Sequence, residues 1–137
     1  MSVACSKRPR KAETATSSKK PRLADHNLSM RKIYIHQIRE GTKCIEGRIY
    51  KGPVKNLKEG RTIRFYYMSK SDDDVVCKIT AIRLFANFQD MLADAPYADY
   101  VPGVKSQEEA VALYLSIPGY KEKSQTYGVC AIDLEKV

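Results

Sequence analysis

Short strand-like segments are spread along this chain without the regular strand–helix alternation that builds a parallel sheet. Residues 62–68 alternate apolar and polar side chains, and a long strand-like run, 75–85, follows a turn signal at 71–74. Residues 128–134 are apolar through Ile132, which predicts a central strand. The pattern predicts an α+β fold around a small curved sheet or barrel.

Other local signals divide the rest of the chain. We expect a strand at 26–30, a helix at 31–40 that ends near Gly41, and a strand at 43–50. In the run 75–85 the apolar positions change parity after Ala81, which predicts a bulge. Asn87 is a good N-cap for a short helix. Ser106–Glu109 is a capping box for a second helix, whose expected buried residues are Ala110, Leu113, Tyr114 and Ile117.

Residues 1–25 differ in composition from the remainder. Residues 1–30 hold 7 Lys/Arg and 2 Asp/Glu, so they carry +5 of the chain's formal charge of +8. The segment has too few aliphatic side chains to offset its chain entropy, which predicts a disordered basic tail. Its two basic clusters have the spacing of a bipartite nuclear import signal, with a solubilising or nonspecific nucleic-acid arm as the alternative. The expected signal residues, read by an import receptor in a nuclear protein, are Lys7, Arg8, Arg10, Lys11, Lys19, Lys20 and Arg22.

Several classes of site are disfavoured by the sequence. The four cysteines, Cys5, Cys44, Cys77 and Cys130, lack the close spacing of zinc ligands, so we expect reduced thiols, no metal and no cofactor. No window is long and apolar enough to span a bilayer, and we expect no membrane association. At this length the chain is expected to form one domain, over residues 26–137, and to be a monomer.

The segment 41–48, GTKCIEGR, holds charges of both signs within a few residues. A period of two places Glu46 and Arg48 on one face of the strand, opposite a mostly apolar face expected to point into the core. A guanidinium oriented by a carboxylate is a good receptor for phosphate or a base edge, and Lys43 could add a phosphate contact. The alternative is an ordinary surface ion pair.

Two further positions are candidates for ligand binding. In Arg64-Phe65-Tyr66-Tyr67, aromatic rings beside a cation suit single-stranded nucleic acid, and Tyr66 is the ring that we expect outside the core. Lys105 lies beside the expected N-terminus of the helix capped by Ser106, where free amides attract anions. Both features also have purely structural explanations.

Four segments in order resemble the activating-signal-cointegrator homology (ASCH) domain, a relative of the RNA-binding PUA fold. They are GTKCIEGR at 41–48, which matches the pattern G-x-K-x-x-E-x-R, RFYY at 64–67, PGVKSQEEAVALY at 102–114, and YGVCAIDL at 127–134. The resemblance covers residues 26–137. It implies a PUA-like β-barrel of five to six strands flanked by short helices, with Lys43, Glu46 and Arg48 lining a cleft for RNA or a nucleotide.

The resemblance leaves more than one function open. The leading expectation is a nuclear RNA-binding protein in RNA metabolism or transcription coactivation, and a protein partner in the cleft is a further possibility. Some ASCH proteins hydrolyse acetylated cytidine with a lysine and a threonine three residues later, and others are described as nucleases. Here Lys43 matches the lysine, but Glu46 occupies the threonine position and cannot be activated as a hydroxyl nucleophile. If the chain is a hydrolase, Lys43 and Glu46 are its expected catalytic residues.

Overall fold

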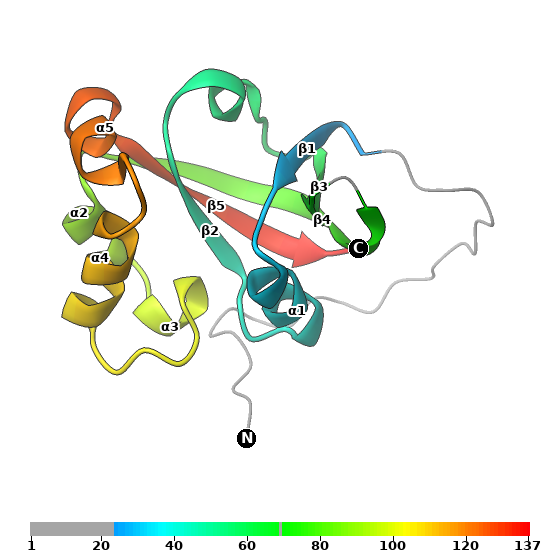
Figure 1. Ribbon diagram of the computed structural model, residues 1–137. Coiled ribbons are helices and arrows are strands. Elements are labelled where there is room, and N and C mark those ends of the chain that lie inside the picture. Colours follow the sequence, from blue (N-terminus) through cyan, green and yellow to red (C-terminus); the bar gives the residue numbers. More distant parts are fainter. Residues whose placement is uncertain (1–23, 69) are drawn as a thin grey trace.

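A computed structural model describes residues 24–68 and 70–137, which contain a five-stranded sheet in the order β1-β3-β4-β5-β2 (Figure 1). Strand β1 pairs with β3 in parallel, and the other neighbours are antiparallel. β5 lies between β4 and β2, so the prediction of a central C-terminal strand is confirmed. The strands are β1 His26–Ser29, β2 Ile45–Ile49, β3 Thr62–Tyr67, β4 Lys70–Phe85 and β5 Val129–Lys136.

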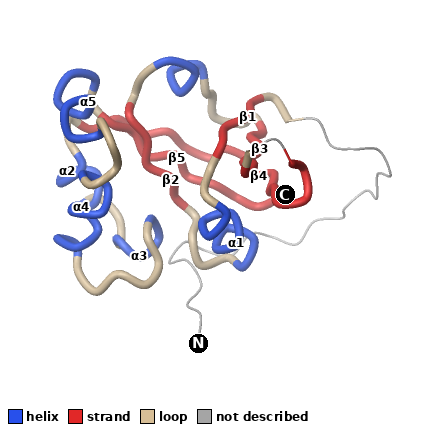
Figure 2. Tube along the Cα trace, in the orientation of Figure 1, coloured by secondary structure: helices blue, strands red, loops and turns tan. Residues whose placement is uncertain are grey.

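Short helices lie on both sides of β2. Helices α2, α3, α4 and α5 gather on one side, and α1 lies with β1 on the other (Figures 1 and 2). The α-helices are α1 Lys32–Glu40, α2 Phe88–Ala93, α3 Tyr97–Tyr100, α4 Gln107–Leu115 and α5 Tyr120–Tyr127, and the 3-10 helix is η1 Gly52–Asn56.

The sheet separates two hydrophobic clusters. Side chains of β5 alternate between them, because successive residues of a strand point to opposite faces. Cys130 and Ile132 join the cluster that α1 covers with Ile35, whereas Val129 joins the cluster formed with α2, α3 and α4. Burial on both faces explains why residues 129–132 are a continuous apolar run rather than an alternating one.

The sheet is a curled half-barrel. β1 and β2 are the first and last strands of its order, and within the described residues no ladder joins them. The predicted α+β class and the number of strands are confirmed, but a barrel closed by backbone pairing is not formed. An open seam therefore remains between β1 and β2, and it is beside this seam that the candidate site lies.

Local predictions have mixed outcomes. The N-cap predictions are confirmed, since Asn87 Oδ1 accepts a hydrogen bond from the Asp90 amide at 2.7 Å and Ser106 Oγ accepts one from the Glu109 amide at 3.0 Å. The Glu109 carboxylate accepts from the Lys105 amide instead of completing a capping box with Ser106. The predicted bulge in β4 is found close to its expected place, as a register shift between Ile79 and Ala81.

Two sequence predictions were wrong. Residues 71–74 lie in β4 rather than in a turn, because Tyr67 already pairs with Lys70. Leu113 on α4 and Ile117 in the turn after it are 38% and 39% exposed rather than buried, because they line the cavity described below. Of the predicted tail, 1–25, residues 1–23 with the whole import signal lie outside the described residues, whereas the Asp25 carboxylate accepts a hydrogen bond from the Thr62 amide at 3.0 Å.

Candidate ligand-binding cavity

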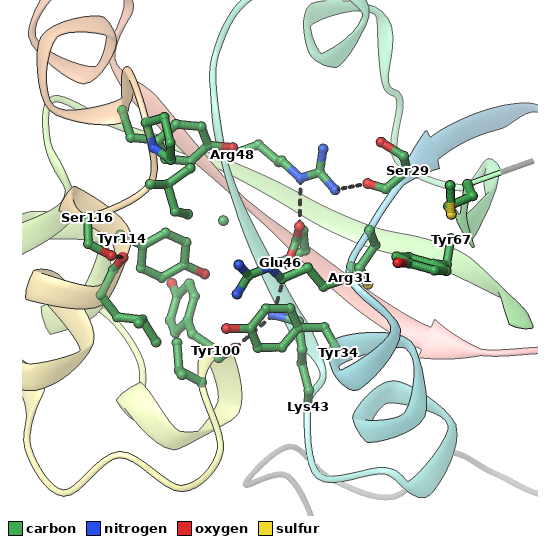
Figure 3. Close-up of a pocket in the computed structure, with 18 residues that line it drawn as sticks. Ser29, Arg31, Tyr34, Lys43, Glu46, Arg48, Tyr67, Tyr100, Tyr114 and Ser116 are labelled. Atoms are coloured by element: carbon green, nitrogen blue, oxygen red, sulfur yellow. Dashed lines mark hydrogen bonds and ion pairs between the residues drawn. The ribbon is translucent and has the colours of Figure 1, made fainter.

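A cavity of about 650 Å³ opens beside the seam between β1 and β2. Its walls come from the ends of β1, β3 and α3, the start of α1, strand β2, the end of α4 and the start of α5. Figure 3 shows Glu46 near the centre, with Tyr100 and Tyr114 on one side and Ser29 and Tyr67 on the other. The charged lining residues are Arg31, Lys43, Glu46 and Arg48, and the lining tyrosines are Tyr34, Tyr67, Tyr100, Tyr114 and Tyr120.

Glu46 is the carboxylate at the centre of the charged group. Its Oε1 lies 3.0 Å from Lys43 Nζ, and its Oε2 lies 2.6 Å from Arg48 Nε. Burial alone would raise the pKa of Glu46, but the two cations outweigh it and hold the pKa below its ordinary value. Glu46 is therefore ionised at neutral pH, with each oxygen already committed to a cation.

Lys43 has a different position from the one that we expected. The side chain is 2% exposed, and its ammonium donates to the carbonyls of Ile45 at 2.8 Å and Tyr100 at 2.7 Å in addition to the Glu46 contact. An ammonium has three donors and no acceptor, so these partners use all of them. Lys43 lines the cavity, but as a tether of Glu46 rather than as a phosphate contact.

Arg48 connects the two edge strands of the sheet. Its Nε donates to Glu46, and its Nη2 donates to the Ser29 carbonyl on β1 at 2.7 Å (Figure 3). Burial alone would lower its pKa, but Glu46 raises it above the ordinary value, so the charge is permanent. The side chain is 17% exposed, and these two bonds leave Nη1 available to a ligand. The predicted pairing of Glu46 and Arg48 is confirmed, and both line the cavity.

Arg31 is a cavity residue that the sequence reasoning missed. It precedes α1, is exposed, and extends toward Glu46 from the side of the cavity opposite Tyr114 (Figure 3). Among the described residues, no ion pair or hydrogen bond of its guanidinium is found, in contrast to Arg48. Its only sequence signal was a cation at the start of an amphipathic helix. With Arg31, Lys43, Arg48 and Glu46, the lining residues carry a net charge of +2 (three cations and one anion).

The aromatic wall is anchored in the core. Phe88 stacks between Tyr114 and Tyr120, with ring centroids 4.8 Å and 5.9 Å from its own. The Gly47 amide donates to the Tyr114 hydroxyl, and burial raises the pKa of Tyr114 well above its ordinary value. These tyrosines are therefore neutral, and the Phe88 stack fixes the wall that they form.

Exposed apolar side chains surround the opening. Tyr67 and Met68 come from the end of β3, and Leu113 and Ile117 come from α4 and the turn after it. They are 38%, 65%, 38% and 39% exposed, respectively. Large apolar side chains at the mouth of a charged cavity are typical of a site that binds an amphiphilic ligand.

Two predicted ligand residues lie outside the cavity. Tyr66 is half-buried under the Arg64 guanidinium, which pairs with Asp74 at 2.6 Å. Because strand residues alternate, it is Tyr67 that reaches the cavity. Lys105 belongs to the turn before α4, where its amide donates to Glu109, and it is absent from the cavity lining.

Metal-ligand groups and membrane-spanning helices were both sought among the described residues. No group of three or more His, Cys, Asp or Glu side chains in 24–68 and 70–137 could hold a metal ion. None of the helices in the same part of the chain has the length and apolar character needed to cross a bilayer.

Comparisons with known proteins agree with this architecture. Hypothetical protein PH0355 is 32% identical over 82% of this chain and 98% of its own, with a TM-score of 0.73. Protein PF0455 from Pyrococcus furiosus is 29% identical over 82% and 96%, with a TM-score of 0.65. ASCH from Zymomonas mobilis is similar in fold alone, at 15% identity over 80% of this chain and 65% of its own, with a TM-score of 0.52.

A search of the curated proteins finds no match. The model of the ASCH domain, in contrast, matches residues 28–137, which include every strand except the first two residues of β1. The chain therefore belongs to the ASCH domain family, and its curled α+β sheet is the fold of that family.

Proposed function

We propose that the cavity binds a nucleotide unit of single-stranded RNA. The observation that carries the proposal is the combination, in one cavity, of tyrosine rings with the guanidinium groups of Arg31 and Arg48. Single-stranded RNA is held by rings that stack on its bases and by cations that bind its phosphates. The volume of about 650 Å³ is in the range of cavities that enclose small organic ligands.

Each half of a nucleotide has a matching part of the cavity. Arg31 and the Nη1 end of Arg48 form the region for a phosphate, because guanidinium groups bind phosphate through paired hydrogen bonds. The rings anchored by Phe88 and the apolar rim form the region for a base and sugar. Glu46 orients Arg48 in this proposal, because its Oε2 accepts from Arg48 Nε while its Oε1 is held by Lys43.

Hydrolysis of a modified nucleoside or of RNA is not favoured by the same geometry. A lysine acts as a base only when its amine is unprotonated, and Lys43 donates to three acceptors, one of them an ionised carboxylate. Glu46 stands where the amidohydrolases of the family have a hydroxyl nucleophile. We therefore propose binding rather than catalysis.

The test is binding of a fluorescein-labelled single-stranded hexanucleotide, measured by anisotropy. All proteins in the test carry Gln in place of the seven basic tail residues, so that the tail contributes no charge. Arg31→Gln and Arg48→Gln should each weaken binding about tenfold or more, as expected for a lost charge-assisted contact. Lys78→Gln is the matched control, because Lys78 is an exposed cation on β4 outside the cavity lining.

Arg31→Gln is the more decisive variant of the two. Arg31 is exposed and has no protein partner in the described part of the chain, so its loss leaves the fold intact. Equal affinities of the Arg31→Gln, Lys78→Gln and tail-neutral proteins would overturn the proposal, as would an absence of RNA binding at low salt.

We also propose that the protein acts in the nucleus, with residues 7–22 as its import signal. The support is the sequence alone, namely the two basic clusters and the spacing between them. A fluorescent fusion of the full chain should accumulate in nuclei, and replacement of Lys19, Lys20 and Arg22 by alanine should distribute it evenly. An unchanged distribution would show that this segment is not the signal.

A further inference from the structure

Two rows of side chains lead away from the cavity, one on β2 and the residue after it, the other on α5. A period of two aligns Glu46 and Arg48 of β2 with Tyr50, which directly follows the strand and is half-buried. On α5, Tyr120 and Tyr127 lie on one helical face, because seven residues are close to two turns. The Tyr50 amide donates to the Gly128 carbonyl at 3.0 Å, so the far ends of the two rows are adjacent.

Each row ends in a tyrosine ring with a lysine over it. Lys51 Nζ lies 4.8 Å from the ring centroid of Tyr127, and Lys55 Nζ lies 5.7 Å from that of Tyr50. Both lysines are exposed, and Tyr127 is 43% exposed. This pairing of rings and ammonium groups repeats, at the far end of the rows, the chemistry of the cavity itself.

The positive charge of residues 48–55 is suited to binding a polyanion. Residues 48–55 contain the cations Arg48, Lys51 and Lys55 and no acidic residue. Aromatic rings interleaved with cations are what a single strand of nucleic acid requires, since bases stack on the rings and phosphates lie at the cations. A protein partner would find few hydrogen-bond acceptors among these side chains.

We propose that a single strand of RNA continues from the cavity past the C-terminal end of β2, with its bases on Tyr127 and Tyr50 and its phosphates at Lys51 and Lys55. This surface, formed by these four residues, is called the β2 track. Tyr120 and Tyr127 are separated by about 10 Å along the helix axis, which corresponds to about three stacked nucleotides at 3.4 Å each. The inference rests on the proposed function, because the cavity holds the first nucleotide of the strand.

The test is the dependence of affinity on RNA length, measured with the full chain. The probes are uridine monophosphate and oligouridylates of two, four and six nucleotides, titrated by calorimetry at several salt concentrations. Wild-type affinity should rise from the monophosphate to the tetranucleotide. In Lys51→Gln/Lys55→Gln, monophosphate affinity should stay unchanged, whereas tetranucleotide affinity should fall about tenfold, with a salt slope smaller by about 1.4.

Two further variants test whether tetranucleotide affinity depends on base stacking and on where the lysines lie, rather than on the total charge of the protein. Tyr127→Leu keeps an apolar side chain but removes the ring, so it should weaken tetranucleotide binding about tenfold and leave monophosphate binding unchanged. Lys58→Gln/Lys78→Gln removes the same charge from exposed positions outside the track and the cavity. Its tetranucleotide affinity should stay within about twofold of wild type.

The outcomes distinguish this inference from the proposed function. If all lengths bind equally to wild type, the track does not exist while the cavity remains a nucleotide site. If the Lys58→Gln/Lys78→Gln protein loses as much tetranucleotide affinity as Lys51→Gln/Lys55→Gln, the gain with length is a nonspecific charge effect and the track is wrong. If neither the monophosphate nor any oligouridylate binds, the proposed function fails, and the track fails with it.

Discussion

At the scale of single residues, the site depends on how Lys43, Glu46 and Arg48 share their hydrogen bonds. Lys43 uses its three donors on Glu46 and two carbonyls, and each oxygen of Glu46 accepts from one cation, Lys43 or Arg48. Only Arg48 keeps donors for a ligand, because its planar group has more of them than its two partners use. The three charges of one short segment thus have different roles.

Lys43→Met should destabilise the protein by about 3 kcal/mol or more. The substitution leaves Glu46 with one cation, and two buried carbonyls lose their donor. The free energy of unfolding, measured in urea, checks the prediction. The double variant Lys43→Met/Glu46→Gln should lose less unfolding free energy than the two single variants lose in total, because it no longer buries an uncompensated charge. If the losses of the two single variants simply add up in the double variant, Lys43 and Glu46 do not stabilise each other.

The stabilising effect of Glu46 should depend on pH. Its pKa in the folded state is lower than the ordinary value of 4.5, so folding favours the ionised form. The contribution is then fully present above about pH 4.5 and is lost as the pH falls through the lower folded pKa. The difference in unfolding free energy between wild type and Glu46→Gln should be constant near neutrality and shrink below pH 4.5. A difference that does not change with pH would show that the carboxylate is not stabilised by its cations.

At the scale of elements, β2 is an edge strand whose outer edge is covered by side chains. The Ile45 carbonyl accepts from Lys43, and the Gly47 amide donates to the Tyr114 hydroxyl. Gly47 also allows α2 and α4 to approach, because a Cβ there would lie 2.7 Å from Met91 Cε and 2.9 Å from Tyr114 Oη. A glycine inside the strand is therefore what brings the aromatic wall to the charged residues.

Gly47→Ala should destabilise the fold by about 1–3 kcal/mol, the usual range for an extra methyl group in a packed site. It should also weaken nucleotide binding, because Tyr114 must move away from the cavity wall. Chemical denaturation and the anisotropy assay measure the two effects. Met91→Leu in the same chain should recover part of the stability, since it removes the nearest contact. A Gly47→Ala protein with wild-type stability would show that the helices are not held close to β2.

Much of the fold follows from local sequence signals. Period-two alternation identified β3, the continuous apolar run identified β5, and the N-cap residues Asn87 and Ser106 located two helices. Helix α5 was missed, because its sequence YKEKSQTY is mostly polar and has no capping side chain before it. The turn at 71–74 was misplaced, because an acidic cluster is a turn signal even where the strand continues through it.

The site was predictable only where its residues are close in sequence. Glu46 and Arg48 are two positions apart on one strand, so their pairing followed from the period of two. Arg31, Tyr114 and Tyr120 reach the cavity through the curl of the sheet and the packing of α4 and α5. No local pattern determines such contacts, since they depend on tertiary packing. Lys43 could not be placed either, because a long side chain at a strand end can turn in several directions.

At the scale of the whole molecule, the cavity lies where the half-barrel fails to close. The two edge strands approach without a backbone ladder, and the Arg48 side chain joins β2 to the Ser29 carbonyl of β1. Helices α4 and α5 complete the other wall. The fold therefore leaves a concave, cationic and aromatic space at its seam, and the account depends on this space being the place where a ligand binds.

The most direct test of that claim is an NMR titration of the ¹⁵N-labelled full chain with a single-stranded tetranucleotide. We expect the largest shifts at the amides of Arg31, Gly47 and Arg48 and at the Arg48 Nε–H group, with smaller shifts along 50–55. The amides of Tyr66 and Lys105, which lie outside the cavity, should move little. Shifts centred on Tyr66 or Lys105, or confined to residues 1–23, would contradict the account.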